Sequence, residues 1–215
     1  MRTGIAPVVW VASYPRSGNT FLRTVLHQCF GLKSGSVYVH DFGGSHAIED
    51  VVGHIEWAEN GAIEFGSAPV KLMKTHWRAP PDLRPAIYVI RDGRDAIASL
   101  FQFWNERQAL TDLIDGRNDF GSWADHVTAW DPKDRPNTLL LRYEDLVGSL
   151  GACIDQIAGF FNLDPKCHTL PSRAELASID GRWIKPENKR APLDEPLLQR
   201  FREINGSVMQ EFGYW

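Results

Sequence analysis

The sequence is poor in cysteine and has no long apolar run. Only three of its 215 residues are cysteines, and no two of them stand in a Cys-X-X-Cys spacing, so we expect neither a disulfide framework nor a zinc site. No stretch approaches the roughly 18 uninterrupted apolar residues of a membrane-spanning helix. The apolar residues 8–12 are also too few for a secretion signal. We therefore expect a soluble protein without stable membrane insertion, in the reducing environment of the cytoplasm.

The chain also lacks an excess of positive charge. Its formal net charge is −4, which disfavours a nucleic-acid partner. Basic residues nevertheless concentrate locally in residues 71–94 and 182–190. Local basic clusters on an acidic chain favour a small polyanionic ligand, although two solvated surfaces would give the same pattern.

Apolar runs alternate with helical periodicities along the chain. We expect strands at residues 8–13, 70–74, 86–91 and 138–143, and helices at 19–30, 47–58, 97–104, 120–130, 146–161 and from about 196 onward. Strands that alternate with helices predict a parallel sheet covered on both faces. With no repeat or linker, residues 1–215 are predicted to form one α/β domain. The strand, turn and helix expected over residues 8–30 would make it a domain of the P-loop-containing type.

The first predicted strand is followed by the turn YPRSG and then by a helix. At Gly18, free backbone N–H groups and the positive end of the helix dipole would favour an anion. Ser17, Asn19 and Thr20 add side-chain donors, and Arg16 adds a charge. The Walker A pattern GxxxxGK[ST] is absent, which argues against a kinase. A plain tight turn with a capping serine would explain this segment alone equally well.

Several segments, in order, resemble one family, the PAPS-dependent sulfotransferases of the cytosolic type. Residues 14–21 resemble its 5′-phosphosulfate loop, commonly YPKSGTTW, and residues 74–76 resemble its KTH segment with the catalytic base. Residues 88–101 resemble its 3′-phosphate motif, RDxRDxxxSxxxF, and residues 142–146 its RYEDL segment. The ending, residues 201–214, resembles that of many bacterial members. Each motif alone is moderately specific, and their joint occurrence in the family's order is the stronger signal.

This resemblance implies transfer of a sulfuryl group from 3′-phosphoadenosine-5′-phosphosulfate (PAPS) to a hydroxyl or amine, without a metal. His76 matches the general base, and Arg16 matches the catalytic cation beside the leaving phosphate. The implied donor-binding residues are Arg16, Ser17, Gly18, Asn19, Thr20 and Phe21 around the 5′-phosphosulfate, Arg91 and Ser99 at the 3′-phosphate, Tyr143 near the adenine, and Lys189, Arg190 or Arg182 in the late basic segment.

The sequence departs from the family pattern in three places. Arg16 replaces the commoner lysine, and Phe21 replaces the usual tryptophan. The family's late RKGxxGxW segment has no clean copy; residues 180–190 are its nearest counterpart. In residues 33–69 we recognise no family motif, so the acceptor (carbohydrate, lipid, glycopeptide or small phenol) stays open, as does the oligomeric state.

Two other functions compete with this interpretation: a P-loop nucleotide kinase, and a non-catalytic module that keeps the fold. The retained His76 and Arg16 disfavour the second. The remaining histidines show no close metal-ligand spacing, and we expect them at the surface or in an acceptor pocket. The tryptophans predicted beside the site are Trp57, Trp77, Trp104 and Trp183.

Overall fold

The computed structural model describes residues 8–105, 107–185 and 193–215. Five parallel strands form one sheet in the order β2-β3-β1-β4-β5. Their bounds are β1 (Val8–Ser13), β2 (Ser34–Ser36), β3 (Lys71–Thr75), β4 (Ala86–Ile90) and β5 (Thr138–Arg142). Because all neighbouring strands are parallel, their carboxyl ends lie along one edge of the sheet.

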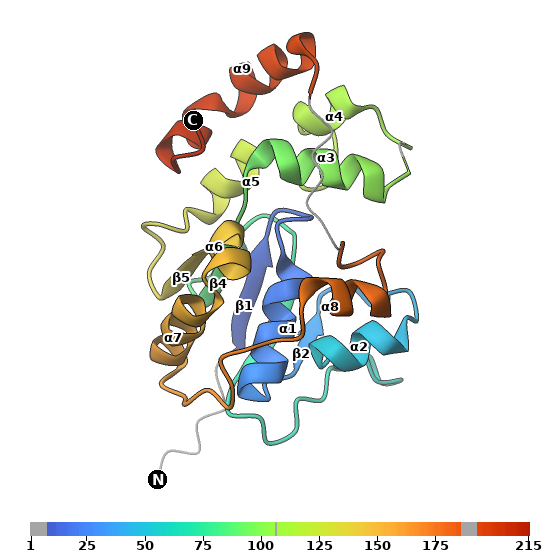
Figure 1. Ribbon diagram of the computed structural model, residues 1–215, viewed down its shortest axis with the longest axis vertical. Coiled ribbons are helices and arrows are strands. Elements are labelled where there is room, and N and C mark those ends of the chain that lie inside the picture. Colours follow the sequence, from blue (N-terminus) through green and yellow to red (C-terminus); the bar gives the residue numbers. More distant parts are fainter. Residues whose placement is uncertain (1–7, 106, 186–192) are drawn as a thin grey trace.

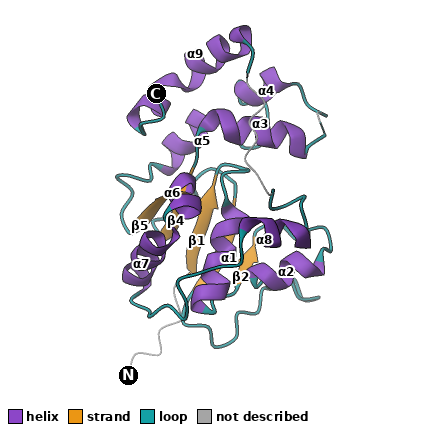
Figure 2. Ribbon diagram, in the orientation of Figure 1, coloured by secondary structure: helices purple, strands orange, loops and turns teal. Residues whose placement is uncertain are grey.

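Helices connect the strands and follow the last one (Figure 2). They are α1 (Asn19–Phe30), α2 (His46–Val52), α3 (Gly93–Phe103), α4 (Leu110–Ile114), α5 (Trp123–Trp130), α6 (Tyr143–Gly148), α7 (Leu150–Phe161), α8 (Arg173–Ile179) and α9 (Glu195–Glu211). The alternation of strands and helices confirms the predicted α/β class, a parallel sheet flanked by helices.

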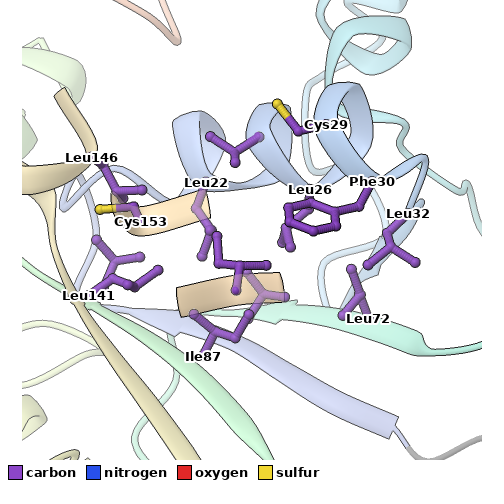
Figure 3. Packing of buried hydrophobic residues seen from close by; sticks show 14 of the residues in the cluster. Leu22, Leu26, Cys29, Phe30, Leu32, Leu72, Ile87, Leu141, Leu146 and Cys153 are labelled. Carbon is purple, nitrogen blue, oxygen red and sulfur yellow. The ribbon is translucent and has the colours of Figure 1, made fainter. Parts of the chain in front are cut away.

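The sheet is buried on both faces. In β1, Val9 and Val11 face one core and Ala12 faces the other, as the two-residue period of a strand requires. The first core joins the sheet to α1, α6 and α7, and Figure 3 shows Leu22 and Leu26 of α1 in this packing. The second core joins the opposite face to α3, α5 and α9, which gather above the sheet in Figure 1.

The observed elements differ from the expected ones at several places, among them the short helices α4 and α8, which were not expected. The helix expected over 47–58 ends at Val52, because Gly53 adopts φ 60° and terminates it. The helix expected over 146–161 is divided at Ser149 (φ −140°) into α6 and α7. The strand β2 was not expected, since Ser-Gly-Ser has no strand propensity of its own.

Candidate donor and acceptor site

The carboxyl ends of the strands meet at a cavity of about 600 Å³. Ligands of open α/β sheets bind at this edge, where the connections leave the first strand in opposite directions. Here β1 lies between β3 and β4. The lining residues include Arg16, Gly18, Asn19, Thr20, Phe21, Tyr38, Asp41, Lys74, His76, Arg91, Ser99, Phe103, Trp104, Phe120, Tyr143, Arg173, Trp183 and Lys185.

The loop between β1 and α1 forms one wall of this cavity. Gly18 has φ 101° and Arg16, which is not a glycine, has φ 65°, a conformation that costs about 1–3 kcal/mol and is tolerated mostly at functional sites. Helix α1 has no side-chain cap and no acidic residue in its first turn. The Ser17 hydroxyl is buried with no hydrogen-bond partner among the described residues. The start of α1 therefore offers backbone donors without a side-chain cap to an anion, as a phosphosulfate requires.

The Tyr143 ring lines the cavity and packs against Gly18 of this loop. A Cβ on Gly18 would lie within 2.9 Å of Tyr143 Cε2, so only glycine fits under the ring. Two guanidinium groups stack on the same ring, with the Arg91 Cζ 4.5 Å and the Arg173 Cζ 5.8 Å from its centroid. This arrangement brings two positive charges to the end of the cavity where the 3′-phosphate is expected.

Arg16 reaches across the cavity toward α3. Its Nε donates to the Ser99 hydroxyl at 3.3 Å, and its backbone carbonyl accepts from Arg91 Nη1 at 2.9 Å. The guanidinium also packs over the Phe103 ring at 4.5 Å. Burial, with a smaller contribution from the Arg91 charge, lowers the pKa of Arg16 to about 10. Arg16 thus stays charged at neutral pH and contacts the predicted 3′-phosphate residues directly.

His76 lies just past β3 and lines the cavity. Its Nδ1 is 2.8 Å from the Ser13 carbonyl. A carbonyl only accepts, so Nδ1 carries the proton and Nε2 has a free lone pair. Burial, and secondarily the Lys74 charge, lowers the pKa of His76 well below 6.5. The imidazole is therefore neutral at pH 7 and able to accept a proton.

A second buried histidine fixes the backbone of the first. His126 is fully buried; its Nε2–H donates to the His76 carbonyl at 3.0 Å, and its Nδ1 accepts from the Tyr88 hydroxyl at 2.8 Å. Burial lowers the pKa of His126 to about 4. This chain from α5 and β4 holds the His76 backbone in one place.

Aromatic side chains surround His76. The rings of Tyr38 and Phe120 lie 6.1 and 6.3 Å from the imidazole, and Trp104 stacks on Phe120 at 6.4 Å. Trp77 packs against the same Phe120 ring at 5.5 Å. The part of the cavity above His76 is thus suited to an acceptor with an apolar or ring-shaped body.

The predicted tryptophans have different roles. Trp104 and Trp183 line the cavity, and Trp77 packs beside it. Trp57 instead donates to the Ser36 carbonyl at 3.0 Å, outside the lining.

Most of the predicted site residues come together at this cavity. Ser17 is an exception, since its side chain is buried and does not line the cavity. Lys189 and Arg190 lie outside the described residues. Arg182 contributes its backbone carbonyl to Arg16 at 3.5 Å, while its side chain pairs with Asp180.

Sequence reasoning missed several residues of the site: Arg23, Tyr38, Asp41, Arg173 and Lys185. Four of them, all except Lys185, fall outside the segments that resemble family motifs. A signal for the helix that carries Arg173 was available, because Ser172 followed by Glu175 is a capping box that starts a helix; it does not by itself indicate a site residue.

Among the described residues, one group of possible metal ligands lies elsewhere. The ligand atoms of His46, Glu49 and Glu56 are within 4.8 Å of one another, and none of the three lines the cavity. His46 and Glu49 pair at 2.9 Å. Across the described residues, no helix combines the length and the apolar character needed to cross a membrane.

Solved structures with a similar fold include two that contain 3′-phosphoadenosine-5′-phosphate (PAP). Mouse sulfotransferase SULT7A1 complexed with PAP superposes with a TM-score of 0.63 at 15% identity, covering 96% of this chain and 86% of that one. Retinol dehydratase in a complex with retinol and PAP gives a TM-score of 0.66 at 16% identity, covering 97% and 83%. At such identities the likeness establishes the sulfotransferase fold.

Curated relatives are sulfotransferases that extend beyond this chain. Sulfotransferase 4A1 of Mus musculus is 26% identical over 175 residues, which cover 72% of this chain and 60% of the relative. Cytosolic sulfotransferase 1 of Danio rerio is 29% identical over 185 residues, 72% of this chain and 59% of the relative. This chain therefore spans less than two thirds of either relative. The family profile described as "Sulfotransferase domain" matches residues 6–195, and the chain belongs to the sulfotransferase domain family.

Proposed function

We propose that this protein transfers a sulfuryl group from PAPS to a hydroxyl or amine of a small-molecule, glycan or lipid acceptor, by in-line displacement. The observation that carries the proposal is the position of His76. Its unprotonated Nε2 belongs to a side chain that lines the same cavity as the anion-accepting loop. Sulfuryl transfer needs a general base and a binding site for the anionic donor in one cavity.

PAPS would supply the activated sulfuryl group and its leaving phosphate. His76 would accept the acceptor's proton during attack, which a neutral imidazole can do near pH 7. Arg16 would stabilise the charge that grows on the leaving phosphate, since its guanidinium is charged and held beside Ser99. Because Arg16 remains protonated, it acts by charge and not as a proton donor.

The remaining donor contacts follow from the lining residues. The α1 N-terminus at Gly18, Asn19 and Thr20 would hold the 5′-phosphosulfate. Arg91 and Ser99 would hold the 3′-phosphate. The PAP present in both fold neighbours supports this donor for the present chain. The cytoplasmic location remains a prediction from the sequence.

The decisive variant is His76→Asn, with His168→Asn as control, since His168 is an exposed histidine paired with Asp155 away from the cavity. Transfer of ³⁵S from labelled PAPS is measured with one phenol, one saccharide and one lipid alcohol as acceptors. Loss of a general base lowers the turnover number by about 10²–10⁴-fold. PAP affinity by calorimetry should change only a few-fold.

Two results would contradict the proposal. If the folded wild type bound ATP but not PAP, the assignment of PAPS as the donor would be wrong. If His76→Asn bound PAP and transferred sulfate at the wild-type rate, His76 would not be the base.

A further inference from the structure

Asp41 is a buried carboxylate held between two buried cations. Its Oδ2 is 2.6 Å from Arg23 Nη1, and its Oδ1 pairs with Lys74 Nζ. The Asp41 side chain is only 3% exposed, and those of Arg23 and Lys74 are 1% and 9% exposed. Breaking such a buried pair typically costs about 3–5 kcal/mol, because an uncompensated charge remains.

Arg23 fixes the orientation of this carboxylate. Besides Asp41, the guanidinium donates to the Ser34 hydroxyl at 2.7 Å, to the Ser34 carbonyl at 3.2 Å and to His54 Nδ1 at 2.9 Å. Arg23 lies in α1, the helix that follows the anion-accepting loop. One carboxylate oxygen is thus anchored to α1, and the other is left for Lys74.

Lys74 and His76 lie on the same strand end and line the same cavity. The Lys74 ammonium also packs over the Tyr38 ring, 4.4 Å from its centroid. The Tyr38 hydroxyl accepts from the His76 backbone N–H at 3.1 Å, and the Val37 N–H donates to the Lys74 carbonyl at 3.0 Å. Residues 37–41 and 74–76 therefore form one connected unit beside the base.

Asp41 is needed at this place for an electrostatic reason. An isolated ammonium loses its hydration when buried and tends to give up its proton. A carboxylate in contact keeps the charged form favoured. Arg23 and Lys74 together carry two positive charges against the one negative charge of Asp41, so the unit retains a net positive charge at the cavity wall.

We propose that Asp41 is a positioning residue that holds Lys74 protonated and aimed into the cavity beside His76, where its charge stabilises the oxygens of the transferred sulfuryl group. Asp41 acts through Lys74 and does not touch the reacting atoms. This inference rests on the proposed sulfuryl transfer, and its new element is the role of Asp41 in holding Lys74, a cation that lines the same cavity as Arg16.

The protonation of Lys74 gives the proposal a distinctive pH signature. Burial lowers the pKa of Lys74 to about 8, although the adjacent Asp41 opposes this shift. The charged and titratable groups around the ammonium are Asp41, Arg23, Arg16, Tyr38 and His76. A lysine is charged below its pKa, so wild-type turnover should decline as the pH rises past about 8. Without Asp41 the decline should begin about 1–3 pH units lower.

The test compares pH–rate profiles between pH 5.5 and 10 for wild type, Asp41→Asn, Lys74→Arg and the control Asp50→Asn. Asp50 is exposed on α2 and does not line the cavity. The assay is ³⁵S transfer from PAPS to the acceptor that the wild type uses fastest. We expect the alkaline decline to move to lower pH in Asp41→Asn, to be lost in Lys74→Arg, and to be unchanged in Asp50→Asn. If the rate of Asp41→Asn declined at the same alkaline pH as the rate of the wild type, the inference would be overturned.

A second measurement does not depend on turnover. The rate at which acetic anhydride acetylates Lys74, followed by peptide mass spectrometry across the same pH range, reports the fraction of free amine. The Lys74 titration should move to lower pH in Asp41→Asn, and an unchanged titration would overturn the inference even if no acceptor were found. If the wild type binds PAP but transfers nothing, the proposed function fails, and this labelling still decides the role of Asp41.

Asp41→Asn leaves Arg23 buried without its carboxylate and can weaken folding. If Asp41→Asn does not fold, the double variant Asp41→Asn/Arg23→Met is used for the labelling experiment, because it removes both charges of the pair. Its Lys74 titration should again lie below that of the wild type, and an equal titration would overturn the inference.

Discussion

At the scale of single residues, Tyr143 organises the donor end of the cavity. Its ring covers Gly18 and stacks against Arg91 and Arg173. Arg173 also donates to the Lys185 carbonyl at 2.6 Å, which ties α8 to the residues before 186. Arg173 therefore adds a basic side chain to the cavity lining beside Tyr143.

Arg173→Ala should weaken PAP binding. A hydrogen bond to a charged group contributes about 1.5–3 kcal/mol, so the dissociation constant should rise by roughly 10- to 150-fold. The exposed Arg202→Ala on α9 is the matched control, because Arg202 stacks on Trp215 and does not line the cavity. Calorimetry with PAP measures both. Equal affinities of Arg173→Ala and wild type would remove Arg173 from the donor site.

At the scale of secondary-structure elements, α1 serves the core and the site together. Leu22, Val25 and Leu26 are fully buried against the sheet, while the helix N-terminus at Gly18 opens on the cavity. The same twelve residues also carry Arg23. Any change that displaces α1 is therefore expected to reach both the stability of the domain and the anion site.

Gly18→Ala tests this coupling. The added methyl group would collide with Tyr143. The backbone of residue 18 would also have to keep φ 101°, a conformation that is unfavourable for a residue with a Cβ. We expect a loss of about 1–3 kcal/mol in unfolding free energy and at least tenfold weaker PAP binding. Gly151→Ala in α7 is the control, because nothing lies within 4 Å of its new Cβ; it should be neutral or slightly stabilising. Unchanged PAP affinity in Gly18→Ala would contradict the role of this turn.

The sequence predicted the elements that have a strong local signal. Residues 8–13 and 19–30 coincide with β1 and α1, because a β-branched run and a helical periodicity are both patterns of residues close together in the sequence. β2 forms only because Ser34 to Ser36 pair with Leu72 to Lys74 of β3, a long-range contact that no local pattern encodes. The bacterial character suggested by the C-terminal residues remains a prediction.

The same division applies to the site. Residues within motifs, such as Arg16, His76 and Arg91, could be placed in advance. Asp41 could not, because its role depends on Lys74, 33 residues later, and because Asp41 lies in a segment where we recognised no family motif in the sequence.

At the scale of the whole molecule, buried histidines link stability to pH. His126 is fully buried and neutral, with its pKa lowered to about 4. In the unfolded chain a histidine titrates near 6.5. The unfolded state therefore binds more protons below pH 6.5, and the folded state loses stability as the pH falls from about 6.5 toward 4. A pKa shift of this size corresponds to roughly 3 kcal/mol of unfolding free energy.

Urea unfolding at pH 7.5 and pH 5 measures this loss. The wild type should lose unfolding free energy on acidification, with His76 adding to the effect because its pKa is also lowered. His126→Gln removes one titrating group, so its stability should depend less steeply on pH, although it is less stable at pH 7.5. Parallel pH dependences of the two proteins would show that His126 does not contribute.

The donor loop and His76 line one continuous cavity, and this has a kinetic consequence. In the proposed reaction, donor and acceptor must occupy that space simultaneously, so sulfuryl transfer passes through a ternary complex with no sulfated enzyme between two half-reactions. The acceptor's side of the cavity stays available while spent PAP still fills the donor's side. A second acceptor can then enter before PAP has left, so turnover should slow at high acceptor concentration.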